Sequence, residues 1–210
     1  MSLGERLQDL WAGLKARAYG GPNDPERDEH ARPDEVIRTL ALLGGERVAD
    51  IGSGAGYYTF RLARAVGPTG VVYAVDVDAG LLRRIAREAE REGLANVRTV
   101  ESSPDEPGLP EPVEMMFASN SYHHIPDRVG YFRRAGRDLQ PGGRIVIVEG
   151  HREGIARFLG HATDPDRIVG ELSAAGYQLT GRHDFLESAS FLIFRRRAAE
   201  EPPPDPARHA

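Results

Sequence analysis

The sequence of 210 residues contains no cysteine. This absence excludes a disulfide scaffold, a cysteine nucleophile, a zinc ribbon, an iron–sulfur cluster and a prenylated tail. Long apolar runs are missing too, since none approaches the roughly 18 residues of a membrane span. The first residues, MSLGERLQDLW, include acidic side chains and lack the apolar centre of a secretory signal. We therefore expect a cytoplasmic protein with no membrane partner.

Lysine is nearly absent, because Lys15 is the only one in the chain. The 27 basic side chains are outnumbered by 32 acidic ones, which gives a net charge of −5. A protein that binds nucleic acid normally shows a basic footprint. The charge balance therefore argues against a nucleic-acid partner.

The composition that remains, 40% hydrophobic and 28% charged residues, is that of an ordinary globular domain. We divide the chain into three parts. Residues 1–32 hold an amphipathic helix, followed by a polar segment too rich in proline and glycine to be regular. This part is a candidate lid, in which Trp11 and Tyr19 could face substrate. Residues 33–197 form the domain, and the charged, proline-rich residues 198–210 are expected to be a disordered tail.

Short β-branched runs alternate with helical patterns from residue 33 onward. Helical periodicity covers Pro33 to Leu43, and it recurs after the N-cap candidates Asp78, Asp127 and Asp164. Strands that alternate with helices indicate β–α–β crossovers and a parallel sheet covered on both faces. The five strand-like runs are RVADIG, VVYAVDV, VRTVES, VEMMFAS and RIVIVEG.

Two more strand-like runs, Tyr177–Phe185 and Ala189–Arg195, follow the last helix and are joined by a short turn. We expect this hairpin to place an antiparallel strand at the edge of the sheet. The predicted fold class is α/β: a doubly wound, mostly parallel seven-stranded sheet with helices on both faces and an antiparallel last strand.

The strongest functional signal is the segment DIGSGAG at residues 50–56, where a buried strand runs into a glycine loop and then directly into a helix. Glycines let the backbone turn sharply and approach a ligand closely. The next strand ends at Asp76, where a carboxylate can accept both hydroxyls of an adenosine ribose. Asp76 could instead cap the following helix, but Asp78 fits that role better. Together the two elements indicate an adenosine-containing ligand.

The loop does not have the dinucleotide pattern G-x-G-x-x-G, because Tyr57 occupies the position of the third glycine. Asp50 would repel a phosphate but attract an amino or sulfonium group. No phosphate-binding G-x-x-x-x-G-K-[ST] motif is present. A cationic adenosine ligand, S-adenosylmethionine, fits best, and a nicotinamide-dependent oxidoreductase is disfavoured.

Over roughly residues 33–197 the sequence resembles the class I S-adenosylmethionine-dependent methyltransferases, whose fold is Rossmann-like. Four motifs in order support the resemblance: DIGSGAG, AVDVD, SNSYHHIPD and LQPGGRIVIVE. The resemblance implies that S-adenosylmethionine is the cofactor. It also implies a set of cofactor-binding residues: Asp50, Gly52, Ser53, Gly54 and Gly56 for the methionine end, Asp76 and Val77 for ribose and adenine, and Ser119 and Asn120 beside the sulfonium and the acceptor.

One departure concerns the adenine amino group, which the family often holds with the acid of a Gly-Asp-Ala sequence after the third strand. Here the chain reads Ser102-Ser103-Pro104, with Asp105 nearby. Either Ser103 or Asp105 would accept that hydrogen bond.

The resemblance implies methyl transfer to a small-molecule acceptor by in-line displacement, for which positioning supplies most of the catalysis. The catalytic residues are unknown, with Tyr122, His123 and His124 as candidates because they follow the fourth strand. One of two adjacent histidines usually packs inward, and we treat His30 as a surface residue. We expect no metal site. A non-catalytic module that binds S-adenosylmethionine or S-adenosylhomocysteine is the alternative, and the sequence says nothing about oligomeric state.

Overall fold

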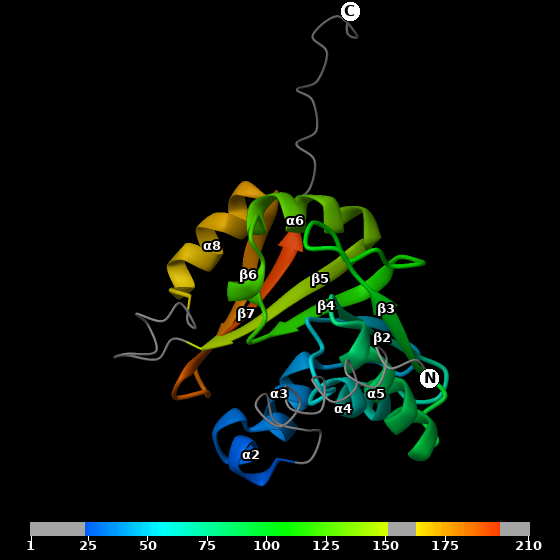
Figure 1. The fold of residues 1–210 in the computed structure, drawn as a ribbon. Coiled ribbons are helices and arrows are strands. Elements are labelled where there is room, and N and C mark those ends of the chain that lie inside the picture. The colour runs from blue at the N-terminus through cyan, green and yellow to red at the C-terminus, as the bar shows by residue number, and fades with distance from the viewer. Residues whose placement is uncertain (1–23, 151–162, 198–210) are drawn as a thin grey trace, which may run out of the picture.

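The computed structural model describes residues 24–150 and 163–197 (Figure 1). The N-terminal amphipathic helix, Trp11, Tyr19 and the C-terminal tail lie outside these residues. The strands are β1 (Arg47–Ile51), β2 (Val71–Asp76), β3 (Val97–Glu101), β4 (Val113–Ser119), β5 (Leu139–Gly150), β6 (Tyr177–His183) and β7 (Ala189–Arg196). The helices are α2 (Pro25–Ala31), α3 (Pro33–Leu40), α4 (Thr59–Val66), α5 (Ala79–Arg91), α6 (Arg128–Ala135) and α8 (Pro165–Ala174), with 3-10 turns η1 (Tyr122–His124) and η2 (Gly136–Asp138).

The strands form one seven-stranded sheet in the order β3-β2-β1-β4-β5-β7-β6. All neighbours from β3 to β5 pair in parallel, and β7 runs antiparallel to both β5 and β6. This confirms the predicted doubly wound sheet with an antiparallel last strand. The prediction that this strand lies at the edge is wrong, because β7 inserts between β5 and β6 and leaves β6 outermost. The apolar sequence of β7, buried at Phe191, Leu192 and Phe194, explains its interior place.

Helices cover both faces of the sheet, with α3, α4 and α5 on one side and α6 and α8 on the other (Figure 1). The alternation of side chains along β5 divides the core between these faces. Ile145 and Ile147 pack toward α6 and α8, while Val146 and Val148 pack toward α3 and α4. Helices cover both apolar faces, which leaves the carboxyl ends of the parallel strands as the place for a ligand.

The helix N-caps predicted at Asp78, Asp127 and Asp164 are confirmed, since each side chain accepts hydrogen bonds from backbone N–H groups of its helix. Two details differ from the prediction. Leu139, expected in the helix after Asp127, instead begins β5. The Pro-Gly-Gly sequence at residues 141–143 lies inside β5 at a register shift opposite β4, where Gly142 has a φ of 77°.

The largest difference lies at residues 25–31, which form helix α2 rather than an irregular linker. Asp24 caps this helix by accepting from the Arg27 N–H at 3.1 Å, and Pro25 occupies its first turn. A proline is favourable at that position because its missing N–H has no partner in a helix. The prolines that argued against regular structure therefore mark a helix start.

No helix in the described part of the chain has both the length and the apolar character that a membrane span needs.

Candidate functional site

The carboxyl ends of the parallel strands meet at one edge of the sheet, and the strand order reverses between β1 and β4. Open α/β sheets bind ligands at such a switch point. The segments that hold the predicted cofactor residues follow β1, β2, β3 and β4, so the topology brings all of them to this edge.

The glycine loop after β1 is fastened to the end of β2. The backbone N–H groups of Gly52 and Ser53 both donate to the Val75 carbonyl, at 2.8 and 3.0 Å. Gly52 has a φ of 69°, and a Cβ placed on it would lie 2.4 Å from the Cβ of Ser121. Only glycine fits at this position. A Cβ on Gly54 would meet nothing within 4 Å, so the loop is open on that side.

Asp76 joins the two predicted signals physically. Its carboxylate accepts from the Gly54 N–H at 2.8 Å and from the Asp78 N–H at 2.9 Å. Each carboxylate oxygen can accept a further hydrogen bond. Asp76 thus orders the glycine loop and keeps acceptor capacity for a neighbouring diol.

Two side chains near the glycine loop and Asp76 are in environments that a bound adenosyl group would improve. Ser53 is 7% exposed, and its hydroxyl oxygen has no hydrogen-bond partner among the described residues. Val77, directly after Asp76, is 60% exposed although it is apolar. A buried polar atom without a partner and an exposed apolar side chain both gain from a bound nucleoside-like group.

Asp50 is buried at the end of β1, and its carboxyl group accepts from the Thr59 hydroxyl at 2.6 Å. Burial raises the pKa of Asp50 to about 7, and the nearby negative charge of Asp76 adds to the increase. The Thr59 hydrogen bond and the positive charge of Arg27 act in the opposite direction. A cationic ligand nearby would stabilise the charged carboxylate.

The raised pKa of Asp50 predicts a pH dependence of stability. Between its ordinary value of 3.8 and about 7, the folded chain binds more protons than the unfolded chain, so this group makes the fold less stable as pH rises. Asp50→Asn keeps an oxygen acceptor for Thr59 but carries no charge. We therefore compare the free energy of unfolding of this variant with that of wild type at two pH values. We expect the difference, variant minus wild type, to be about 2 kcal/mol larger at pH 8 than at pH 5. Urea unfolding at both pH values measures this, and a pH-independent difference would contradict it.

The two candidates for the adenine contact differ in their hydrogen bonding. The Ser103 hydroxyl oxygen already accepts from the backbone N–H groups of Asp105 and Glu106, both at 3.2 Å. The Asp105 carboxylate is exposed, and Arg134 lies 3.8 Å away. Asp105 is therefore the better acceptor for an amino group, because the acceptor positions of Ser103 are occupied.

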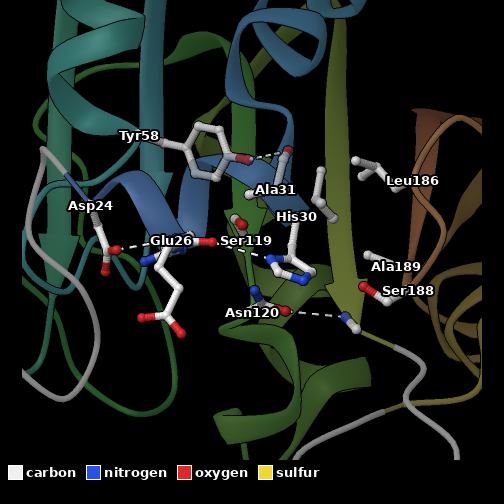
Figure 2. Close-up of a pocket in the computed structure, with 13 residues that line it drawn as sticks. Asp24, Glu26, His30, Ala31, Tyr58, Ser119, Asn120, Leu186, Ser188 and Ala189 are labelled. Atoms are coloured by element: carbon white, nitrogen blue, oxygen red, sulfur yellow. Dashed lines mark hydrogen bonds between the residues drawn. The ribbon is translucent and has the colours of Figure 1, made fainter.

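Ser119 ends β4, Asn120 follows it directly, and both line a cavity of about 360 Å³. Asn120 has a φ of 50°, and its side-chain oxygen accepts from the Gly150 N–H at 3.1 Å. Asparagine tolerates this left-handed conformation better than most residues. The hydrogen bond fixes the junction of β4 and β5 at the mouth of the cavity (Figure 2).

Helix α2, which lies within the candidate lid of residues 1–32, forms the opposite wall of this cavity (Figure 2). It contributes polar side chains, while β5, β7 and the loop before β7 add smaller and apolar ones. The lining residues from α2 and its cap are Asp24, Glu26, Arg27, His30 and Ala31. The remaining described ones are Tyr58, Ser119, Asn120, Val148, Gly150, Leu186, Ser188 and Ala189.

Tyr57 attaches α2 to the glycine loop. Two guanidinium groups lie against its ring, with the Arg27 and Arg61 central carbons 3.7 and 4.3 Å from the ring centroid. The Tyr57 hydroxyl donates to Asp28 at 2.5 Å, and Arg61 pairs with the same carboxylate at 2.9 Å. The tyrosine that replaces the third dinucleotide glycine therefore holds the cavity wall in place.

The three catalytic candidates after β4 are directed differently. The Tyr122 hydroxyl donates to Glu171 of α8 at 2.7 Å, and burial raises its pKa. His123 lies against Glu149, with 2.5 Å between its Nδ1 and a carboxylate oxygen. His124 is exposed. None of the three belongs to the described lining of the cavity.

No group of three or more His, Cys, Asp or Glu side chains within residues 24–150 and 163–197 is arranged to hold a metal ion. His151 and His161 lie outside these ranges.

A family model described as a methyltransferase domain matches residues 48–143. Aklanonic acid methyltransferase DauC of Streptomyces sp. (strain C5) is 36% identical over 105 residues, which cover 50% of this chain and 48% of that protein. The 27-O-demethylrifamycin SV methyltransferase of Amycolatopsis mediterranei (strain S699) is 34% identical over 150 residues, covering 67% of this chain and 53% of that protein. The chain thus spans about half the length of these curated relatives.

Among solved structures, a SAM dependent methyltransferase from Aquifex aeolicus superposes with a TM-score of 0.73 at 22% identity. The match covers 81% of this chain and 93% of that one. At this identity the likeness shows a shared fold, which agrees with the strand order and the antiparallel β7 described above.

Proposed function

We propose that this chain, which belongs to the class I S-adenosylmethionine-dependent methyltransferases, transfers a methyl group from that cofactor to a small-molecule acceptor. One observation supports this most: the Asp76 carboxylate accepts from the Gly54 N–H of the open glycine loop at 2.8 Å, and the preceding loop residue, Ser53, has a buried hydroxyl without a described partner. This arrangement offers acceptors and a close backbone approach where an adenosyl group would lie.

The predicted cofactor residues fit S-adenosylmethionine by their chemistry. Asp76 would accept from the ribose hydroxyls, Val77 would cover the adenine ring, and Asp105 would accept from its amino group. The Gly52–Gly56 loop, with Ser53, would line the methionine end, and Asp50 would stabilise positive charge there. When bound, the cofactor supplies a methyl group attached to a sulfonium sulfur. The thioether that remains after transfer is the leaving group of the reaction. Ser119 and Asn120 would lie beside both the sulfonium and the acceptor, which leaves the in-line path to the methyl carbon open.

The small-molecule acceptor is supported by the cavity and by relatives. A volume of about 360 Å³ lies within the range of small-molecule pockets, roughly 300–1,000 Å³. The relatives named above act, by their names, on aklanonic acid and on a demethylrifamycin. The net charge of −5 does not favour nucleic acid as an acceptor. A cytoplasmic location remains a prediction from the sequence.

Isothermal titration calorimetry with three ligands tests the cofactor assignment. We expect S-adenosylmethionine and S-adenosylhomocysteine to bind and NADH to give no heat of binding, because Tyr57 and Asp50 do not suit a pyrophosphate. Binding of NADH alone would contradict the proposal and support the oxidoreductase alternative.

Binding does not distinguish an enzyme from a binding module, since both need the same residues. Transfer of tritium from methyl-labelled S-adenosylmethionine across a panel of small molecules separates them. We expect transfer to at least one class of acceptor. Tight binding without transfer to any acceptor would support the module.

A further inference from the structure

The lining of the cavity includes His30, which the sequence analysis assigned to the surface and which is exposed in the structure. His30, on the last turn of α2, lines the cavity opposite Ser119 and Asn120 at the end of β4 (Figure 2). We propose that His30 is the general base of the reaction and that the acceptor is a hydroxyl group on an apolar, ring-bearing molecule, a phenol. This inference rests on the proposed methyl transfer.

The hydrogen bonding of His30 selects its tautomer. Its Nδ1 lies 3.1 Å from the Glu26 carbonyl oxygen, one helical turn earlier. A carbonyl oxygen only accepts hydrogen bonds, so Nδ1 carries the hydrogen. In the neutral ring Nε2 then has a free lone pair, and Figure 2 shows the ring lying in the cavity beyond this bond. A histidine with one nitrogen fixed by a carbonyl is prepared to accept a proton at the other.

The other histidines of the described chain do not offer this arrangement. His123 is bonded to Glu149, and neither it nor the exposed His124 lines the cavity. His183 lies on β6 and packs near Phe185 and Phe191. Within residues 24–150 and 163–197, His30 is thus the imidazole that lines the cavity.

The remaining lining indicates what His30 would act on. Tyr58, Val148 and Leu186 provide an apolar wall for a ring. The charged lining groups, Asp24, Glu26 and Arg27, all come from the α2 side, whereas the described strand and loop residues opposite are uncharged. An acceptor with an apolar body and one polar group facing α2 matches this division.

A base at this position is useful for a hydroxyl, because an un-ionised phenol is a weak nucleophile. The acceptor oxygen forms a bond to the methyl carbon as the carbon–sulfur bond breaks. The sulfonium leaves as a neutral thioether, and the phenolic proton moves to Nε2 of His30. The imidazolium then returns the proton to water.

Two phenols of different acidity test the role of His30. The probes are 4-methoxyphenol, which is un-ionised at pH 8, and 4-nitrophenol, which is largely ionised there. We expect His30→Gln to slow tritium transfer from labelled S-adenosylmethionine to 4-methoxyphenol by about 100-fold or more, the range of general-base catalysis. Transfer to 4-nitrophenol should fall less than about tenfold, because that acceptor needs no base. His183→Gln is the matched control and should transfer to both at the wild-type rate.

An equal loss with both phenols would show that His30 shapes the cavity and would overturn the base assignment, as would an unchanged rate with 4-methoxyphenol. A wild-type protein that binds S-adenosylhomocysteine but methylates neither phenol would overturn the acceptor class. Failure of the wild type to bind S-adenosylhomocysteine would instead contradict the proposed function itself. Calorimetry of His30→Gln with S-adenosylhomocysteine should give the wild-type affinity, since His30 is assigned to the acceptor.

Discussion

Replacing Asp76 by alanine should weaken S-adenosylhomocysteine binding by at least about 100-fold while the chain remains folded. Two effects combine in this variant. The carboxylate that would accept from the ribose hydroxyls is lost, and each such hydrogen bond to a charged group contributes roughly 1.5–3 kcal/mol. The 2.8 Å bond that holds Gly54 is lost too, so the loop is no longer ordered before the ligand arrives. A 100-fold change corresponds to about 2.8 kcal/mol.

Titration calorimetry with S-adenosylhomocysteine measures this effect, and circular dichroism establishes that the variant is folded. Glu90→Ala provides the matched control, because Glu90 is an exposed acid on α5 and its removal lowers the charge by the same amount. We expect the control to bind as the wild type does. An Asp76→Ala protein with unchanged affinity would rule out the ribose role and leave Asp76 as a support for the loop alone.

The parts of the fold and site that the sequence predicts well are those set by local rules. Strand and helix periodicity locates β1 to β5, and the Asp78, Asp127 and Asp164 caps fix three helix starts. Parallel strands must bring their carboxyl ends to the same edge, so the glycine loop and Asp76 are expected to be neighbours. The bond from Gly54 to Asp76 is the direct consequence of that topology.

The parts that the sequence predicts poorly depend on contacts between distant segments. Helix α2 has a local start signal at Asp24-Pro25, but its place is set by contacts with distant residues. Its Asp28 side chain is hydrogen-bonded to Tyr57, 29 residues away, and to Arg61, 33 residues away. No periodicity within residues 24–31 indicates that this short helix forms a cavity wall. His30 is exposed, as the sequence analysis expected, but its place in the cavity lining follows from these distant contacts. The position of β7 inside the sheet likewise depends on pairing with β5, far along the chain.

The directions of the two adjacent histidine side chains after β4 also could not be predicted from the sequence. A sequence can state that one of two neighbours usually packs inward, but it cannot say which. The 3-10 turn η1 directs His123 toward Glu149 and leaves His124 exposed. This asymmetry gives the two residues different expected effects when they are replaced.

Removing the His123 side chain should destabilise the fold by about 3–5 kcal/mol. Glu149 is 0% exposed on β5, and its second carboxylate oxygen has no hydrogen-bond partner among the described residues. The His123 side chain, 8% exposed, supplies the described partner of the first oxygen. His123→Ala would leave a buried carboxyl group without that partner, and breaking a buried pair by removing one member costs about this much. Urea unfolding measures the change directly.

His124→Ala is the control at the adjacent position: it removes the 4.0 Å ring contact with His123 but no buried pair, so we expect it to cost less than about 1 kcal/mol. A second background identifies the cause of the loss. A Glu149→Leu chain has no carboxyl group at this position that could lose its partner. His123→Ala should therefore lower the free energy of unfolding much less there than in wild type. Equal costs in both backgrounds would mean that His123 acts only by filling space. The expected inequality would place His123 in the structural support of β5 and leave the acceptor cavity to residues of α2.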